Sequence, residues 1–277
     1  MKKFEGYIVA LVWVFLLSFH FAYLNYNQVC GDEPFSIFHA AMAPGEIVRE
    51  LLKGNNPPLY EVLLHFWTSA WGYGTVAVRS FSVVLMFAGW LAFLPIAKAL
   101  QQKHLLWILP IVFTFSELLF MRNIEARMYP LLLATVTWSW AAWIQLKATR
   151  KIKWAVILGV ALGVSLYVHY LALFHIATIG VVTLLFISKA WKQKIVAGLL
   201  TLLLTLPLLI LIFSKSSGYQ NDHWLEVEVS TKNFLLYGFS IWNHAIVIAG
   251  LGLIFLVDHF MLKSEVVKKL QSWLWPL

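Results

Sequence analysis

Residues 57–74 read PPLYEVLLHFWTSAWGYG, an apolar segment that begins with two prolines and ends with two nearby glycines. A helix that crosses a hydrocarbon core needs roughly 20 apolar residues, so this segment is close to the required length. Its prolines and glycines instead favour a shorter helix that lies along the membrane surface. The choice matters because every later segment would change sides if residues 57–74 crossed.

The rest of the chain is also rich in apolar side chains. Of its 277 residues, 61% are hydrophobic and only 12% are charged, which is more apolar surface than one soluble core could bury. Long apolar runs predict membrane-spanning helices, because a helix satisfies its own backbone hydrogen bonds in lipid. A closed barrel would need segments of alternating polarity, which the sequence lacks. We expect an all-α polytopic membrane protein with about eight spans, at residues 7–24, 77–97, 105–121, 128–146, 154–172, 173–188, 195–213 and 235–257.

This pattern predicts a single transmembrane domain over residues 1–277. A first outer loop, residues 25–76, would hold interfacial helices, and a late outer loop would cover residues 214–234. Residues 258–277 would form a cytoplasmic tail. The N-terminal apolar run has the basic flank of a signal peptide, but it is long and no small-x-small cleavage site follows, so we expect an uncleaved anchor.

The distribution of charge predicts the orientation. Cytoplasmic loops carry an excess of Lys and Arg. If residues 57–74 do not cross, 14 of the 21 basic residues lie on the same side as both termini, and 10 of the 13 acids lie on the other side. If they cross, only 7 basic residues remain inside. We therefore expect both termini in the cytoplasm, a bacterial plasma membrane as the location, and residues 57–74 at the outer surface.

Charge and cysteine content exclude several classes of protein. The net charge of +8 comes from short clusters between apolar runs, which indicates topology and not nucleic-acid binding. No Lys, Arg or Asp lies in the middle of a predicted span, which argues against an ion-coupled transporter. Cys30 is the single cysteine, so there is no intrachain disulfide and no spacing typical of a cysteine zinc site.

Polar residues gather on the predicted outer face. Arginine offers a planar cation that suits phosphate oxygens, and a carboxylate can accept the proton of a nearby hydroxyl. Together they predict transfer of a group from a phosphate carrier to a hydroxyl. The residues concerned are Asp32 and Glu33 in GDEPF, Arg79 after residues 57–74, Arg122 and Arg127 in MRNIEARMYP, and His169 and His175 in YVHYLALFH.

Each of these groups also has a simpler interpretation. The two acids could cap the helix expected to begin near Pro34. The arginines of MRNIEARMYP could contact lipid headgroups, and the histidine of YVHY could belong to an interfacial belt. Glu61 and His65, one helical turn apart, could pair with each other. The order of the groups and their shared side favour a common site.

Four stretches, in this order, resemble the GT-C glycosyltransferases of family 39, which include dolichyl-phosphate-mannose protein mannosyltransferases and bacterial aminoarabinose transferases. They are DEPF at residues 32–35, NPPLYEVLLHFWTSAWGYGTVAVRSFSVV at 56–84, EARMYPLLLATVTWSW at 125–140, and YVHYLALFH at 167–175. The resemblance implies a GT-C-like transmembrane module. It also implies an enzyme that transfers a sugar from a polyprenyl-phosphate carrier to an acceptor hydroxyl on a lipid, glycan or protein at the outer membrane face.

The resemblance implies roles for individual residues. In the family, an acid of the first outer loop acts as the base and an Ala-Arg-x-Tyr arginine holds the carrier phosphate, which here match Asp32 and Arg127. The candidate residues are Asp32 and Glu33 for catalysis, Arg127, Arg79 and Arg122 for the donor phosphate, and Tyr60, Tyr129, His169 and Tyr170 for the donor and acceptor pocket.

Two departures from the family leave an alternative open. Asn56 stands where many members have histidine, and relatives continue through further spans that acceptor recognition is thought to use. The alternative is a short, non-catalytic relative that binds a lipid-linked sugar or a membrane partner subunit. Asp222 with His223 could ligate a divalent cation, as in some GT-C enzymes, but we assign no metal or other cofactor.

Overall fold

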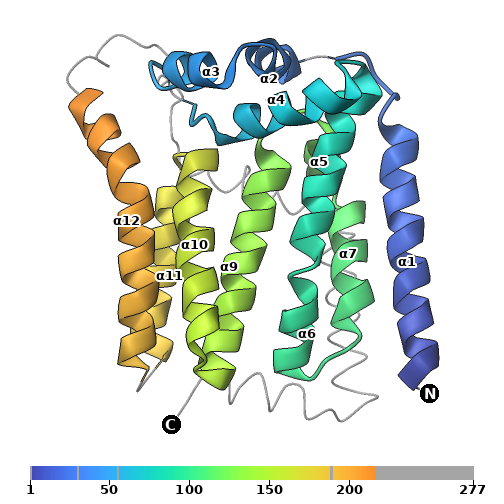
Figure 1. The fold of residues 1–277 in the computed structure, drawn as a ribbon. Helices are drawn as coiled ribbons and strands as arrows, with labels where there is room; N and C mark the ends of the chain where they lie inside the picture. Colours follow the sequence, from blue (N-terminus) through green and yellow to red (C-terminus); the bar gives the residue numbers. More distant parts are fainter. Residues whose placement is uncertain (1, 30, 55, 188–189, 216–277) are drawn as a thin grey trace, which may run out of the picture. The chain divides into compact units, whose positions relative to one another are not determined.

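The computed structural model describes residues 2–29, 31–54, 56–187 and 190–215, and every regular element in these ranges is an α-helix (Figure 1). The chain divides into two compact units, and the described residues belong to the first of them except for residues 115–118. The predicted late loop beyond residue 215, the span 235–257, the tail 258–277 and the pair Asp222–His223 lie outside the described residues. The helices are α1 (Lys2–Tyr23), α2 (Glu33–Ala40), α3 (Pro44–Leu51), α4 (Leu59–Trp71), α5 (Thr75–Trp90), α6 (Phe93–Leu100), α7 (Leu105–Phe115), α8 (Glu117–Ile124), α9 (Tyr129–Thr149), α10 (Ile152–Val168), α11 (Ala172–Phe186) and α12 (Trp191–Lys215).

Three helical segments in the described ranges are long and apolar enough to cross a membrane. They are Gly6–Tyr23, Thr75–Leu100 and Trp191–Leu211. Three further apolar helices, Leu105–Phe115, Ile152–Val168 and Ala172–Phe186, are shorter. The described chain is therefore helical, with segments suited to a membrane, but the predicted count of about eight spans is not confirmed.

Two predicted spans are interrupted. The span predicted at residues 77–97 is divided into α5 and α6, because Pro95 has no N–H to donate to the carbonyl one turn earlier. The carbonyl of Pro95 instead accepts a hydrogen bond from Gln145 Nε2 of α9, at 2.7 Å. The span predicted at residues 105–121 is divided into α7 and α8, where Ser116 and Glu117 form a helix-start signal within the apolar run.

Helices α2, α3 and α4 lie across one end of the long helices of the first unit (Figure 1). α4 has 13 residues, which gives a length of about 20 Å, shorter than the roughly 30 Å of a hydrocarbon core. It starts after the two prolines and ends at Gly72, whose φ of 84° lies in the left-handed region that favours glycine. This geometry agrees with the expectation that residues 57–74 do not cross.

Helices α10 and α12 of the first unit pack closely against each other. Gly159 and Gly163, four residues apart, face α12. A Cβ at Gly159 would lie 2.7 Å from the carbonyl oxygen of Ala197, and one at Gly163 would lie 2.6 Å from Cβ of Leu204. The two glycines therefore allow an approach that a larger residue would prevent, as in small-xxx-small packing of membrane helices.

Candidate functional site

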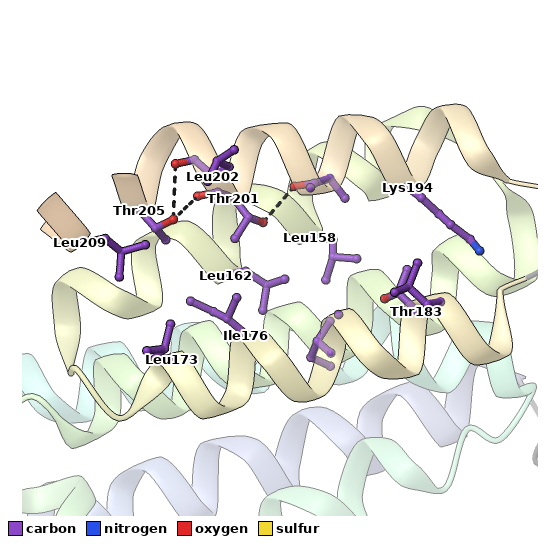
Figure 2. Close-up of a pocket in the computed structure, with 15 residues that line it drawn as sticks. Leu158, Leu162, Leu173, Ile176, Thr183, Lys194, Thr201, Leu202, Thr205 and Leu209 are labelled. Carbon is purple, nitrogen blue, oxygen red and sulfur yellow. Dashed lines mark hydrogen bonds between the residues drawn. The ribbon is translucent and has the colours of Figure 1, made fainter. Parts of the chain in front are cut away.

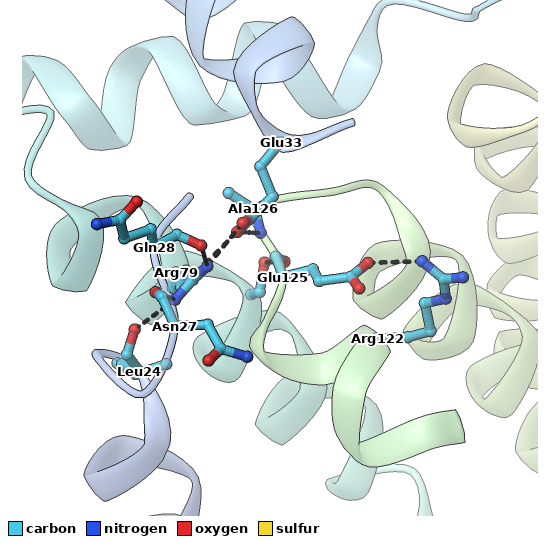
Figure 3. Close-up of polar contacts among 9 residues, drawn as sticks. Leu24, Asn27, Gln28, Glu33, Arg79, Arg122, Glu125 and Ala126 are labelled. Atoms are coloured by element: carbon cyan, nitrogen blue, oxygen red, sulfur yellow. Dashed lines mark hydrogen bonds and ion pairs between the residues drawn. The ribbon is translucent and has the colours of Figure 1, made fainter. Parts of the chain in front are cut away.

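The predicted site residues lie at the end of the first unit where α2 meets α5 and the connection between α8 and α9. Figure 3 shows Glu33 on α2, Arg79 on α5 and Ala126 in the α8–α9 connection converging on one point. Three segments far apart in the sequence therefore form this region. The region holds two ion pairs. In the first, a saturated pair, both side chains are buried and every N–H of the arginine donates a hydrogen bond. In the second, the arginine keeps N–H groups without a hydrogen bond to a described residue.

Glu33 and Arg79 form the saturated pair. Arg79 Nε donates to Glu33 Oε1 at 2.8 Å, and Arg79 Nη2 donates to Glu33 Oε2 at 2.7 Å. Both side chains are buried. The backbone N–H of Ala126 also donates to Glu33 Oε1 at 2.9 Å. This carboxylate is thus the point at which α2, α5 and the α8–α9 connection are joined.

The remaining donors of Arg79 hold the loop that follows α1. Its Nη1 donates to the carbonyls of Leu24 and Asn27, both at 2.8 Å, and Nη2 donates to the carbonyl of Gln28 at 3.2 Å (Figure 3). With the two bonds to Glu33, all five N–H groups of the guanidinium are used. The position of Arg79 therefore favours a structural role over the predicted contact with a donor phosphate, and Glu33 is held as its counter-ion.

Arg127 and Asp32 form the second pair. Arg127 Nη2 lies 3.7 Å from Asp32 Oδ2, close enough for an ion pair but too far for a hydrogen bond. Arg127 Nη1 donates to the backbone carbonyl of Asp32 at 3.3 Å and to Ser36 Oγ at 3.1 Å. The Arg127 side chain is 7% exposed, whereas that of Asp32 is 74% exposed. The Asp32 carboxylate is thus exposed, whereas the Arg127 guanidinium next to it is buried.

The bonding of Arg127 is incomplete. Its Nε is buried and makes no hydrogen bond to any residue that the structure describes. Its Nη2 has only the 3.7 Å contact with Asp32 among these residues. Nε and Nη2 form the edge that binds two oxygens of a carboxylate or phosphate side by side, and Arg79 uses this same edge for Glu33. The ring of Phe35 lies 5.5 Å from Arg127 Cζ and covers another part of the group.

The two adjacent acids therefore have different surroundings. Asp32 is the N-cap residue of α2, but its side chain makes no capping hydrogen bond, so the capping interpretation fails for this residue. Glu33 lies in the first turn, where the helix dipole favours an acid, and its carboxylate is fully engaged by Arg79 and Ala126. Only Asp32 has a carboxylate that an outside molecule could contact.

Ser36 and Glu61 extend the site and were not among the candidates. Ser36 Oγ accepts from Arg127 and donates to Glu61 Oε1 at 2.9 Å, so the serine links the cation to a buried acid. Burial raises the pKa of the Glu61 carboxyl, and the bond from Ser36 acts in the opposite direction. The alternative in which Glu61 pairs with His65 is not seen among the contacts of the described residues, where His65 Nδ1 donates to the carbonyl of Ala40 at 2.9 Å. One signal in the sequence indicated Ser36 alone. It follows Asp32 by four residues, so the two lie on the same face of a helix.

The other candidates surround these pairs. Arg122 Nη1 lies 2.7 Å from Glu125 Oε2 (Figure 3). Its Cζ lies 4.8 Å from the ring centre of Tyr129. This ion pair and the ring contact occupy Arg122, but its side chain is 43% exposed, so it stays a candidate for phosphate contact. Tyr129 is half-buried.

Three candidates for the donor and acceptor pocket remain. Tyr60 is fully buried, its hydroxyl lies 3.3 Å from Ser82 Oγ, and burial raises the pKa of the phenol. Its position favours packing within the core over contact with a substrate. His169 and Tyr170 are half-buried just after α10, and His169 Nδ1 accepts from the backbone N–H of Leu171 at 3.1 Å.

Within the described ranges, no group of three or more His, Cys, Asp or Glu side chains could hold a metal ion. No protein-family model, curated protein or solved structure matches the chain. The geometry of its own residues is therefore what bears on function.

Proposed function

We propose that the protein is a membrane glycosyltransferase that transfers a sugar from a polyprenyl-phosphate carrier to an acceptor hydroxyl at the non-cytoplasmic face. One observation carries the proposal: the exposed carboxylate of Asp32 lies 3.7 Å from the guanidinium of Arg127, whose Nε–Nη2 edge makes no hydrogen bond to a described residue. A base and a phosphate-binding group thus stand side by side. The resemblance to family 39 assigns these two residues the same roles.

In the proposed reaction, Asp32 takes the proton of the acceptor hydroxyl as its oxygen attacks the anomeric carbon of the sugar. The bond between that carbon and the phosphate oxygen breaks, and its electron pair leaves with the carrier phosphate. Arg127 stabilises the added negative charge without moving. A single displacement of this kind inverts the anomeric configuration. A positioned base supplies a factor of about 10² to 10⁴, so most of the remaining rate enhancement would come from positioning and from the cation.

The place of the site suits a substrate with a lipid tail. Asp32 directly precedes α2, which lies across the end of the long helices (Figure 1), and Arg127 contacts Asp32. A polyprenyl tail would stay among apolar helices, and its phosphate would emerge at the depth of the lipid headgroups. The site therefore lets one molecule satisfy both its apolar and its charged part.

A second candidate function is binding of a lipid-linked sugar without catalysis. It is favoured by the pairing of Asp32 with Arg127, in which the acid serves only as the counter-ion of a structural ion pair while the unbonded Nε–Nη2 edge still holds the donor phosphate. The saturated pair of Glu33 and Arg79, at the same end of the helices, shows that this region does contain such a pair.

A transfer assay with purified protein separates the two functions. A radiolabelled polyprenyl-phosphate sugar is supplied with and without acceptor to wild type, Asp32→Asn and Arg127→Ala. We expect Asp32→Asn to lower transfer by about 10² to 10⁴ with donor binding retained, and Arg127→Ala to weaken donor binding. Glu50→Gln and Arg49→Ala, at exposed positions of α3, are the matched controls and should behave as wild type. Tight donor binding by wild type without transfer would exclude the enzyme and support the binding protein.

A further inference from the structure

A cavity of about 420 Å³ lies between α10, α11 and α12. Its volume is within the range of small-molecule pockets, and the residues that line it are mostly apolar (Figure 2). Several of them are also exposed on the outside of the helices, among them Leu184 with 71% exposure, Leu173 and Leu202. The cavity is thus a groove that opens toward the surroundings of the helices, where a hydrocarbon chain could enter it from a bilayer.

One polar group in the cavity wall is unpartnered. The Thr183 side chain is 8% exposed, and its hydroxyl has no hydrogen-bond partner among the described residues. A helical threonine usually satisfies its hydroxyl on a carbonyl one turn earlier. Two other threonines of the same cavity do so: Thr201 donates to Ala197 at 2.9 Å and Thr205 donates to Thr201 at 2.8 Å. Thr183 is the exception among them and can donate to a bound acceptor.

A cation lies at the same end of the cavity as Thr183. Figure 2 shows Lys194 extending from α12 toward the part of α11 that carries Thr183. Lys194 is half-buried and makes no ion pair with any residue of the described ranges. It belongs to the basic cluster of residues 189–194 that the charge distribution assigns to the cytoplasmic side. The cavity thus combines an apolar wall with one hydroxyl and one cation at one end.

We propose that this cavity binds one acyl chain of an anionic glycerophospholipid from the cytoplasmic leaflet. Lys194 contacts the lipid phosphate, and the Thr183 hydroxyl donates to an ester carbonyl at the top of the chain. The acyl chain lies along the groove toward Leu162 and Ile176. Basic pockets between membrane helices on the cytoplasmic side bind anionic headgroups in this way. The site is independent of the proposed transferase activity, because its cation lies at the other end of α10 and α12 from Arg127.

Two variants of the cavity test this proposal, each with a control. Gly180→Leu narrows the groove, since a Cβ at Gly180 meets no atom within 4 Å and the longer side chain can extend into the cavity. Its control is Val181→Phe, which adds bulk at a neighbouring position with 55% exposure that does not line the cavity. Lys194→Gln removes the cation. Its control is Lys192→Gln, an exposed residue whose Nζ lies 5.9 Å from the ring of Trp191.

Native mass spectrometry of the full chain in detergent counts the lipids that stay bound. The probes are dioleoylphosphatidylglycerol and dioleoylphosphatidylcholine, which share their chains but differ in charge. We expect wild type and both controls to retain one phosphatidylglycerol in preference to phosphatidylcholine. Lys194→Gln should weaken this binding by about fivefold, the factor for one basic residue near an anionic surface, and Gly180→Leu should abolish it.

Three results would overturn the proposal. They are equal retention of the two lipids by wild type, unchanged retention by Lys194→Gln, and displacement of phosphatidylglycerol by an equimolar polyprenyl phosphate. The last result would assign the groove to the tail of the proposed sugar donor. If Gly180→Leu does not fold, the comparison of Lys194→Gln with Lys192→Gln decides the question alone.

Discussion

Arg79 and Arg127 place the same guanidinium group at the same end of the helices, yet only one of them is fully bonded by the protein. Arg79 has carboxylate and carbonyl oxygens around all five of its N–H groups. Arg127 uses Nη1 and leaves the Nε–Nη2 edge without a hydrogen bond to a described residue. A buried donor without a partner is costly, so a ligand oxygen that accepts from this edge would be favoured.

A structural role for the buried pair predicts strong coupling between its members. Arg79→Met leaves the charge of Glu33 buried, and loss of one partner of a buried pair typically costs about 3 to 5 kcal/mol. We expect Arg79→Met and Glu33→Met each to lower the thermal unfolding midpoint clearly, and the double variant to lose much less than the sum. Thermal unfolding in detergent, analysed as a double-mutant cycle, measures this coupling.

The exposed pair Glu50 and Lys53 on α3, with its 2.7 Å contact, is the matched control and should show little coupling. Donor binding gives a second test of the role of Arg79. If the folded double variant loses affinity for a polyprenyl-phosphate sugar as Arg127→Ala does, then Arg79 contacts the phosphate and the structural interpretation is wrong.

Glu61 predicts a dependence of stability on pH. Its folded-state pKa is raised above 4.5 by burial, so the folded protein holds this proton more tightly than the unfolded chain. The contribution is fully present below pH 4.5 and is lost as pH rises through the folded pKa, with a slope of at most about 1.4 kcal/mol per pH unit. Thermal unfolding of wild type and Glu61→Gln from pH 4 to 8 should therefore show wild type losing stability relative to the variant. A constant difference across this range would contradict the raised pKa.

At the level of residues, the sequence predicts which polar groups meet but not what each one does. The proximity of Asp32 and Arg127 was expected from topology and family resemblance, and the structure brings them within 3.7 Å. The division of labour between Asp32 and Glu33 was not predictable, because it depends on which side of the first turn of α2 faces α5. The link from Ser36 to Glu61 joins residues 25 positions apart, and no local pattern indicates such a contact.

At the level of elements, helices follow from apolar runs, but their interruptions depend on single residues. The predicted helix near Pro34 is present as α2, and residues 57–74 contain the short helix α4. The breaks between α5 and α6 and between α7 and α8 were missed, since hydropathy alone does not register one proline or one helix-start signal inside an apolar run. Glycine spacing also determines which helices can approach each other closely.

The approach of α10 to α12 predicts unequal effects of alanine at three glycines. Gly159→Ala places its Cβ 2.7 Å from a backbone carbonyl, so the helices must separate, and overpacking of this kind typically costs about 1 to 3 kcal/mol. Gly163→Ala places its Cβ 2.6 Å from Cβ of Leu204, an atom that a rotamer change cannot move, so we expect a comparable loss. Gly198→Ala on α12 meets no atom within 4 Å and should be neutral or stabilising. Unfolding midpoints of the three variants give the order, and a loss in Gly198→Ala equal to that in Gly159→Ala would contradict it.

At the level of the whole molecule, the balance of charge and the length of one helix support the same topology. In the predicted orientation, 14 basic residues share a side with both termini, and this count requires that residues 57–74 do not cross. α4, with 13 residues, is independently too short to cross. The segment Thr75–Leu100, with 26 residues, would then be the first crossing after the predicted outer loop. The charge bias gives a statistical preference for a topology in which residues 57–74 do not cross. The length of α4 adds a geometric reason, because a helix of 13 residues is shorter than a hydrocarbon core.

This topology predicts that residues before and after α4 to α6 are reached from opposite sides of the membrane. In a Cys30→Ser background, Glu50→Cys on α3 and Lys98→Cys on α6 place one thiol at each of two exposed positions. An impermeant maleimide should label Glu50→Cys in intact cells, and Lys98→Cys only after the membrane is permeabilised. Because α4 and Thr75–Leu100 are the helices that the structure describes between the two positions, labelling of both in intact cells would mean that residues 57–74 cross as well. The later basic clusters would then lie outside, and the carboxylate of Asp32 and the proposed sugar transfer would no longer share a face with YVHY of residues 167–170.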